Sequence, residues 1–158
     1  MADLHPNCVL INSILAAAGL PGRVRILPEA APTAVTAAAQ LGVDVAAIVN
    51  SLIFSTAEHT PLLVLTSGGH RVDTAKVAAL VGTATLSRAS AEFVRDATGQ
   101  PIGGVAPIGH PAPIRTLLDT ELARFPEIWA AGGVPHAVFP ISYPDLLDLT
   151  SAQPVAVA

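Results

Sequence analysis

One segment limits what this chain can fold into more than any other. Residues 99–115, GQPIGGVAPIGHPAPIR, contain four glycines and four prolines. Proline removes a backbone donor and glycine weakens regular structure, so the segment can be neither a regular helix nor a central strand. Such a loop can offer backbone N–H groups to a carboxylate, a phosphate or a developing oxyanion. The alternative is a structural crossover in which glycine and proline only make turns, and composition alone does not decide between the two.

The segments around this loop predict a mixed α/β (α+β) fold, because helical and strand patterns alternate along the chain. Helices are expected at 5–19, 32–42, 73–82, 90–99 and 142–150, and strands at 23–27, 47–55, 61–67, 114–119, 127–131 and 136–141. The short polar segment TAEHT between two of these strands predicts an antiparallel hairpin. We expect a single domain over 1–158 with a mixed, mostly antiparallel central sheet flanked by helices. Its core is expected at about 23–152, preceded by the helix at 5–19.

Charge and composition exclude several classes of protein. Eight Lys and Arg against twelve Asp and Glu give a net charge of −4, which argues against a broad basic surface for nucleic acid but not against contact with its end. The only cysteine, Cys8, excludes an internal disulfide and is interpreted as a small core residue. No signal peptide or long apolar run is apparent, so we expect a cytoplasmic protein without membrane contact.

The common catalytic motifs are absent. The five histidines lack zinc-site spacing, and there is no nucleophile elbow, Walker loop or dinucleotide fingerprint. We therefore expect no metal and no cofactor. We interpret Asp119 as a helix cap rather than a general base.

Asn50 is the second unusual feature. In a strand it shares one face with Ile48 and Leu52, while Val49 and Ser51 lie on the other. Both faces are largely apolar, so the amide must either find a partner in the core or line a cavity. Asparagine is disfavoured in strands, which favours a residue that holds a ligand.

Several segments together resemble the YbaK/aminoacyl-tRNA deacylase family, the free-standing relatives of the editing domain of bacterial prolyl-tRNA synthetases. They are TAVTAAAQLGV, IVNSLIF, LLVLTSGGHRVDTAKVAALVG, ATGQPIGGVAPIGHP, TLLD and DLLDLT. The resemblance runs from about Thr33 to Thr150. Its most specific element is the G-x-x-P-x-G motif that begins at Gly104 and ends at Gly109.

The resemblance implies a trans-editing hydrolase that cleaves the ester bond of a mischarged aminoacyl-tRNA, with tRNA-Pro carrying a small wrong amino acid as the expected substrate. The loop would cradle the scissile carbonyl, and a ribose hydroxyl of the substrate would help to activate water. The implied catalytic residues are Asn50, Gly104, Val105, Ala106 and Gly109. The implied substrate-binding residues are Ser51, Ser67, Gly68, Arg71, Gly103, Pro107, Ile108 and His110.

One departure from the family pattern bears on activity. Many members carry a lysine where this chain has Asn50, and the only lysine here, Lys76, is interpreted as a solvated surface residue. Asparagine can donate a hydrogen bond but cannot supply positive charge. Three hypotheses therefore stay open: a deacylase acting in trans, a non-catalytic binding module for aminoacyl-adenosine-like ligands, and a structural protein with a vestigial pocket.

The acidic balance also limits the partners. We expect contact only with the acceptor end of an aminoacyl-tRNA, through some of Arg71, Arg95 and Arg115. A prolyl-tRNA synthetase is a second candidate partner, and DNA is not expected. The sequence leaves monomer and homodimer open.

Overall fold

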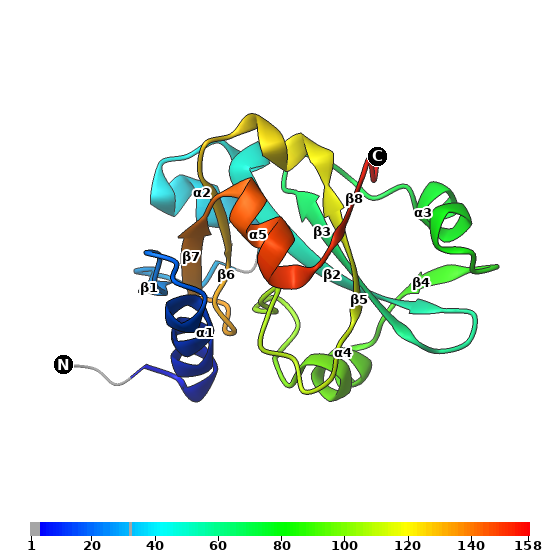
Figure 1. Cartoon of the computed structure of the whole chain (residues 1–158), viewed down its shortest axis with the longest axis horizontal. Helices are drawn as coiled ribbons and strands as arrows, with labels where there is room; N and C mark the ends of the chain where they lie inside the picture. Colours follow the sequence, from blue (N-terminus) through cyan, green and yellow to red (C-terminus); the bar gives the residue numbers. More distant parts are fainter. Residues whose placement is uncertain (1–3, 32) are drawn as a thin grey trace.

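The computed structural model describes residues 4–31 and 33–158 (Figure 1). The helices are α1 (Pro6–Ala17), α2 (Ala34–Leu41), α3 (Thr74–Val81), α4 (Ala91–Thr98) and α5 (Tyr143–Thr150), with 3-10 turns η1 (Val45–Ala47) and η2 (Thr120–Arg124). The strands are β1 (Arg25–Ile26), β2 (Ile48–Thr56), β3 (Pro61–Ser67), β4 (Leu86–Arg88), β5 (Arg115–Asp119), β6 (Ile128–Ala131), β7 (Ala137–Ile141) and β8 (Gln153–Val155). Along this described chain no helix combines the length and apolarity that crossing a membrane requires.

The strands form one mixed sheet in the order β1-β7-β6-β2-β3-β5-β8, and β4 pairs with β2 outside this path. The predicted hairpin is confirmed: β2 and β3 are antiparallel, with Asn50 opposite Thr66. Antiparallel pairs also join β1 to β7, β6 to β7 and β4 to β2, whereas β2–β6, β3–β5 and β5–β8 are parallel. The mixed α/β fold class predicted from the sequence is therefore confirmed.

Capping side chains set the helix ends where the sequence predicts them. The first turns of α2, α3, α4 and α5 each donate a backbone N–H to the side chain of the residue before the helix, namely Thr33, Asp73, Ser90 and Ser142. Three of these helices end at a glycine with positive φ: Gly42, Gly82 and Gly99.

The structure differs from the sequence prediction at short strands. The strand predicted at 23–27 is reduced to Arg25–Ile26. The sequence does not predict β4 or β8, because each is a three-residue strand defined by pairing with a neighbour rather than by its own apolar pattern. Residues 1–3 of the predicted domain, and Pro32 of the predicted helix 32–42, lie outside the described residues.

Helices cover both faces of the sheet. On one face α1, α4, α5 and the glycine/proline loop pack over the largest core cluster, which includes Val49 and Leu65; Figure 1 shows α5 in front of the strands. On the other face, α2 packs over a cluster around Ile48, and α3 packs over a separate cluster around Phe54. Asn50 lies on this second face, between the two apolar clusters, because it alternates with Val49 along the strand.

The edge of β2 that faces away from β3 is paired only in part. β6 pairs with Ile48 and Val49, and β4 pairs with Phe54–Thr56, so within the described chain neither reaches residues 50–53. Ile48 O accepts from Gly68 N on the β3 side, and Ile53 O accepts from Ala89 N on the other side. Because backbone direction alternates along a strand, the N–H and C=O of Ser51 point into the gap between β6 and β4.

Candidate functional site

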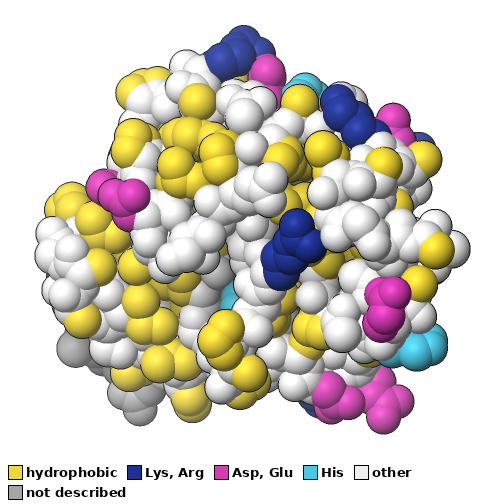
Figure 2. Space-filling model, turned by 45° about the vertical axis from the view of Figure 1, so that its right-hand side comes forward, with side chains coloured by type: hydrophobic (Ala, Val, Ile, Leu, Met, Phe, Trp, Pro, Cys, Tyr) yellow, Lys and Arg dark blue, Asp and Glu magenta, His cyan; other side chains and the backbone are white. Residues whose placement is uncertain are grey.

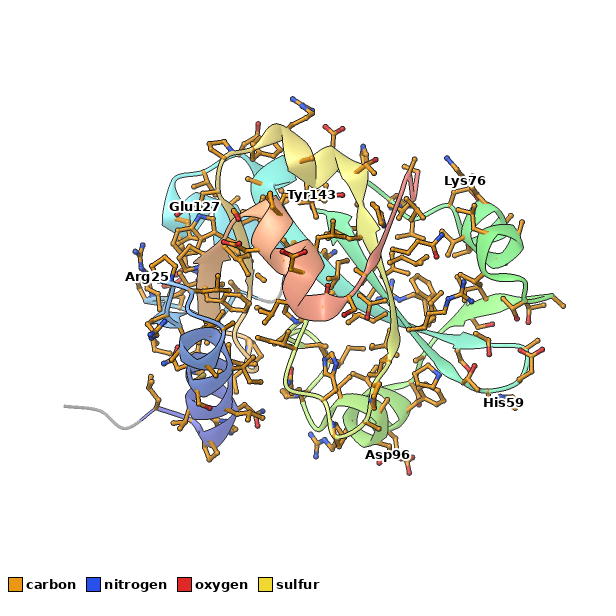
Figure 3. The ribbon with its side chains drawn as sticks, viewed as in Figure 1. Arg25, His59, Lys76, Asp96, Glu127 and Tyr143 are labelled. Carbon is orange, nitrogen blue, oxygen red and sulfur yellow. The ribbon has the colours of Figure 1, made fainter. Side chains whose placement is uncertain are left out.

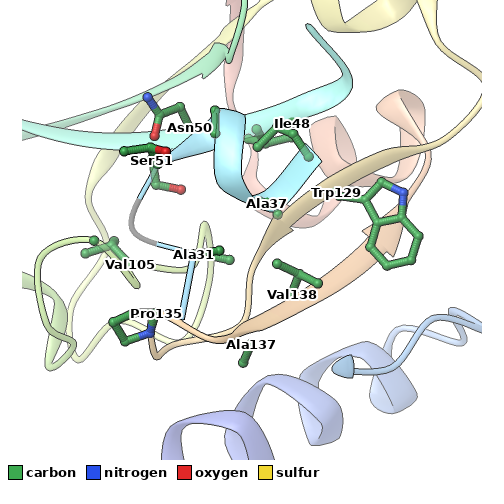
Figure 4. Close-up of a pocket in the computed structure, with 16 residues that line it drawn as sticks. Ala31, Ala37, Ile48, Asn50, Ser51, Val105, Trp129, Pro135, Ala137 and Val138 are labelled. Carbon is green, nitrogen blue, oxygen red and sulfur yellow. The ribbon is translucent and has the colours of Figure 1, made fainter. Parts of the chain in front are cut away.

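Two hollows meet at this gap in the sheet. One is a small cavity of about 60 Å³, and the other is a groove of about 570 Å³. Both are lined by Thr33, Ala34, Asn50, Ser51, Gly103 and Val105. Figure 4 shows Asn50 and Ser51 from β2 on one side of the small cavity and Val105 from the glycine/proline loop facing them.

Asn50 and Ser51 present polar groups without protein partners. The Asn50 amide makes no hydrogen bond with any described residue, and the Ser51 Oγ is buried and likewise unpartnered in the described part of the chain. A buried hydroxyl without a partner is costly, so native structures rarely keep one without a reason. Asn50 is only partly buried, lines both hollows and is not bonded to nearby backbone, so the geometry supports interpreting it as a cavity residue rather than as a core residue.

The far wall of the small cavity is apolar and built from short side chains. Ala37 of α2, Ala31 shortly before that helix and Val138 of β7 line this wall (Figure 4). Trp129 of β6 completes the wall, and the Arg25 guanidinium lies 4.8 Å from its ring centroid. This wall can accept a small apolar group and offers it no charge.

The groove carries the basic side chains of the site. His70, Arg71 and Arg88 line it, and the Arg88 guanidinium lies 5.9 Å from the centroid of the Phe54 ring. The face in Figure 2 shows scattered Lys and Arg side chains rather than a continuous basic surface. Arg95 and Arg115 line neither the cavity nor the groove. The only lysine, Lys76, lies on α3 with its Nζ donating to Ala158 O at 3.0 Å (Figure 3), and it too lines neither hollow.

Asp119 is a buried carboxylate that contacts His70 of the groove and several of its neighbours. Its side chain is 1% exposed, and Oδ1 accepts the N–H of Glu121, which is the predicted helix cap. Oδ2 also accepts from Ser67 N at 3.0 Å and Thr66 Oγ1 at 3.2 Å, and lies 2.8 Å from His70 Nδ1. The same buried carboxylate, together with burial itself, raises the pKa of Tyr143, and burial contributes more.

Gln100 holds the glycine/proline loop from inside, so the prolines do not act alone. Its side chain is 2% exposed; Oε1 accepts from Ala106 N at 2.6 Å, and Nε2 donates to Ile108 O at 3.2 Å. Gly104 N donates to Pro101 O at 3.0 Å. The N–H groups of Gly104 and Ala106 are therefore already engaged. Those of Gly103 and Val105 have no partner among the described residues.

The second half of the predicted motif lies elsewhere. Pro107, Ile108, Gly109 and His110 line a different groove of about 750 Å³, together with Arg115. Burial lowers the pKa of His110, and a hydrogen bond from its Nε2 to Ala106 O partly opposes this. The structure thus separates these four residues from Asn50 and Ser51.

Ser67 and Gly68 contribute to hydrogen bonding and packing within the fold rather than to the site. Ser67 is fully buried and its Oγ donates to Ala46 O at 2.7 Å. A Cβ on Gly68 would lie 2.5 Å from Val45 O, so the position must stay glycine for packing. Neither residue lines the cavity or the groove.

Sequence reasoning missed several residues of the site. Ala31, Ala37, Trp129 and Val138 look like ordinary core residues in the sequence, because only the gap in the sheet turns them into a cavity wall. For His70 the sequence contains one indication of a role in the site: it follows a predicted strand and directly precedes Arg71. Among the described residues no three His, Cys, Asp or Glu side chains gather as metal ligands would.

The chain is similar to several known proteins. A family model described as aminoacyl-tRNA editing domain matches residues 28–149. A crystal structure described as a candidate trans-editing enzyme for prolyl-tRNA synthetase is 40% identical, covers 98% of both chains and superposes with a TM-score of 0.91. A structure described as a hypothetical protein is 29% identical over 94% of this chain and 98% of its own, with a TM-score of 0.86.

A curated relative gives a shorter match. The proline–tRNA ligase of Geobacter sulfurreducens is 37% identical over 69 residues, which is 44% of this chain and only 12% of the ligase. The family model nevertheless spans well over half of this chain, including the strands and the loop that form the cavity. The chain therefore belongs to the aminoacyl-tRNA editing domain family.

Proposed function

We propose that this protein is a trans-editing deacylase that hydrolyses the ester bond between a small wrong amino acid and the 3′ adenosine of tRNA-Pro. Family membership supports the reaction class, and the likeness to a candidate trans-editing enzyme for prolyl-tRNA synthetase supports the choice of tRNA. The observation that carries the proposal is a small cavity of about 60 Å³ that has an apolar far wall and is lined on its other side by the unpartnered Asn50 and Ser51.

The small cavity would receive the side chain of the amino acid. Its volume is several times the roughly 10–15 Å³ that a single water molecule needs. We expect alanine or cysteine side chains to enter the space between Ala31, Ala37 and Val138, and larger side chains to be hindered by this wall. Exclusion by size discriminates modestly, about 10–200-fold per methylene, so several small amino acids should be accepted.

The rim of the cavity would hold the reacting ester. The Asn50 amide and the N–H groups of Gly103 and Val105 are donors without protein partners in the described chain, and all three residues line the cavity. Fixed donors of this type stabilise the oxyanion that develops when water attacks a carbonyl. The adjacent groove, with Arg71 and Arg88, would receive the terminal ribose, base and phosphate.

The open cavity counts against a vestigial pocket, because side chains do not fill it. A non-catalytic binding module differs from a deacylase only in turnover. The decisive test is therefore a deacylation panel of tRNA-Pro charged with alanine, cysteine, serine and proline, run with the wild type, Asn50→Lys and Val138→Ala.

We expect the wild type to release alanine and cysteine fastest. Val138→Ala widens the cavity and should shift the preference toward larger amino acids, which a loss of folding could not do. Tight binding of charged tRNA by the wild type without release of any amino acid, and release only after Asn50→Lys, would overturn the proposal in favour of the binding module.

A further inference from the structure

We propose that His70 is the general base and acid of this site, held in position by Asp119. The inference rests on the proposed function. It assigns the proton transfers of the reaction to a side chain of the protein, whereas the family resemblance implied only a ribose hydroxyl of the substrate. Three observations carry it: the contact between His70 and Asp119, the free second ring nitrogen of His70, and its place in the groove beside Asn50.

Asp119 and Ser67 fix the position and orientation of the His70 ring. His70 Nδ1 lies 2.8 Å from Asp119 Oδ2, and the His70 backbone N–H donates to Ser67 O at 3.0 Å. A carboxylate can only accept, so Nδ1 carries a proton and Nε2 presents its lone pair in the neutral ring. Within the described chain Nε2 has no hydrogen-bond partner, and 32% of the side chain is exposed at the groove.

The carboxylate itself is prevented from moving. Besides His70, Asp119 accepts from Thr66 Oγ1, Ser67 N and Glu121 N while 1% exposed. Thr66 is the cross-strand neighbour of Asn50, so the Asp119 cluster and the Asn50 amide share one face of the sheet. This arrangement, a base oriented by a buried carboxylate that is fixed by further bonds, is one that nucleophile-activating sites use repeatedly.

The proton transfers balance in two steps. Water attacks the ester carbonyl carbon as its proton passes to His70 Nε2, giving a tetrahedral oxyanion and an imidazolium that Asp119 stabilises. The oxyanion then collapses, the carbon–oxygen bond to the ribose breaks, and the Nε2 proton passes to the departing ribose oxygen. The products are a free amino acid and a tRNA with an intact terminal hydroxyl, and His70 returns to its starting state.

Charges of both signs lie around His70. The Asp119 carboxylate contacts its Nδ1, and the guanidinium groups of Arg71 and Arg88 line the same groove. Tyr143 lies near enough to Asp119 for that carboxylate to contribute to raising its pKa, so it stays neutral through the neutral pH range.

The test compares His70→Asn with His59→Asn. In His70→Asn the shorter amide side chain can still donate to Asp119, but it places no group where Nε2 lies in the wild type. His59 lies on the hairpin turn with φ +61°, a conformation that asparagine tolerates, and it serves as the matched control (Figure 3). The readout is kcat/KM against pH on the tRNA-Pro carrying alanine or cysteine, with the uncatalysed rate subtracted.

In the wild type and in His59→Asn, kcat/KM should rise with pH across the range from 5 to 8 in which histidines change charge. In His70→Asn it should fall by about 10²–10⁴-fold and lose this rise. In His70→Gly, added imidazole should restore part of the rate, which a merely structural role would not allow.

Wild-type activity with an unchanged pH profile in His70→Asn would overturn this inference and leave the proposed function standing. A folded wild type without activity on any charged tRNA would overturn both.

Discussion

A Cβ atom on Gly104 would lie 2.5 Å from the carbonyl carbon of Val134, in the turn between β6 and β7. The loop backbone therefore packs directly against another segment of backbone, and no flexible side chain is available to move away. Gly104 is required for this close approach, and its N–H is engaged with Pro101 O.

Gly104→Ala should accordingly destabilise the protein by at least about 2–3 kcal/mol, because a backbone clash cannot relax as an overpacked core can. At this chain length each kcal/mol lowers Tm by roughly 2–4 °C. Gly99→Ala is the control: its Cβ would meet nothing within 4 Å, and only the positive φ opposes it, at a cost of about 1–2 kcal/mol. Equal losses in the two variants, measured by thermal melting, would contradict the packing explanation.

Gln100→Ala should loosen the loop from inside. It leaves Ala106 N–H and Ile108 O without their buried partner, at about 1–3 kcal/mol each. Hydrogen exchange at the Ala106 amide should speed up as well. Gln40→Ala removes the same pair of bond types, here to Glu29 on the surface, and should cost far less.

Asp119→Asn should be among the most destabilising single changes. The buried carboxylate accepts hydrogen bonds from four residues, and the substitution replaces one of its oxygens by a donor NH₂ group. At least one buried donor therefore loses its partner, which should cost about 1–3 kcal/mol. Asp73→Asn is the matched control, because asparagine caps the exposed start of α3 as well as aspartate does. Urea unfolding of both variants gives the comparison.

Ser51→Ala should stabilise the fold. The Oγ is buried without a partner among the described residues, so removing it removes a desolvation penalty of about 1–3 kcal/mol. Ser13→Ala, on the exposed face of α1, should not change stability by much. A destabilised Ser51→Ala would show that the hydroxyl has a structural partner after all.

Arg71→Gln and Arg88→Gln should each weaken binding of the tRNA acceptor end and reduce its dependence on salt. Two phosphate contacts with a single strand give a slope of log K against log salt of about −1.4, and each substitution should reduce it by about 0.7. Arg124→Gln, whose side chain pairs with Glu121 outside the groove, is the control. A slope several times steeper in the wild type would indicate a tRNA surface beyond this groove.

Much of the fold could be predicted because local signals and tertiary structure agree. Thr33, Asp73, Ser90 and Ser142 cap their helices as expected, and the polar turn closes the β2–β3 hairpin. The strands β4 and β8 could not be predicted, since their pairing depends on long-range contacts.

The site was predictable only in part, and for the same reason. Asn50 stands out in the sequence as a polar residue in an apolar strand, and the structure places it at the cavity. The glycine pattern of the loop does not reveal that its two halves face different grooves, or that Gln100 engages one of its donors. Asp119 shows its capping role in the sequence, but its contacts with Thr66 and His70 arise only from the arrangement of β3 beside β5.

The gap along β2 also has a consequence for solubility. An unpaired strand edge is a template on which other chains can add and aggregate, and proteins protect such edges by keeping them short or covered. Here the free edge is limited to residues 50–52, because Ile53 O accepts from Ala89 N, and it is flanked by β6 and β4 within the same sheet. A strand from another molecule would therefore have too few free backbone groups to pair with, whereas the proposed ligand, one amino acid joined to a ribose, is short enough for this gap.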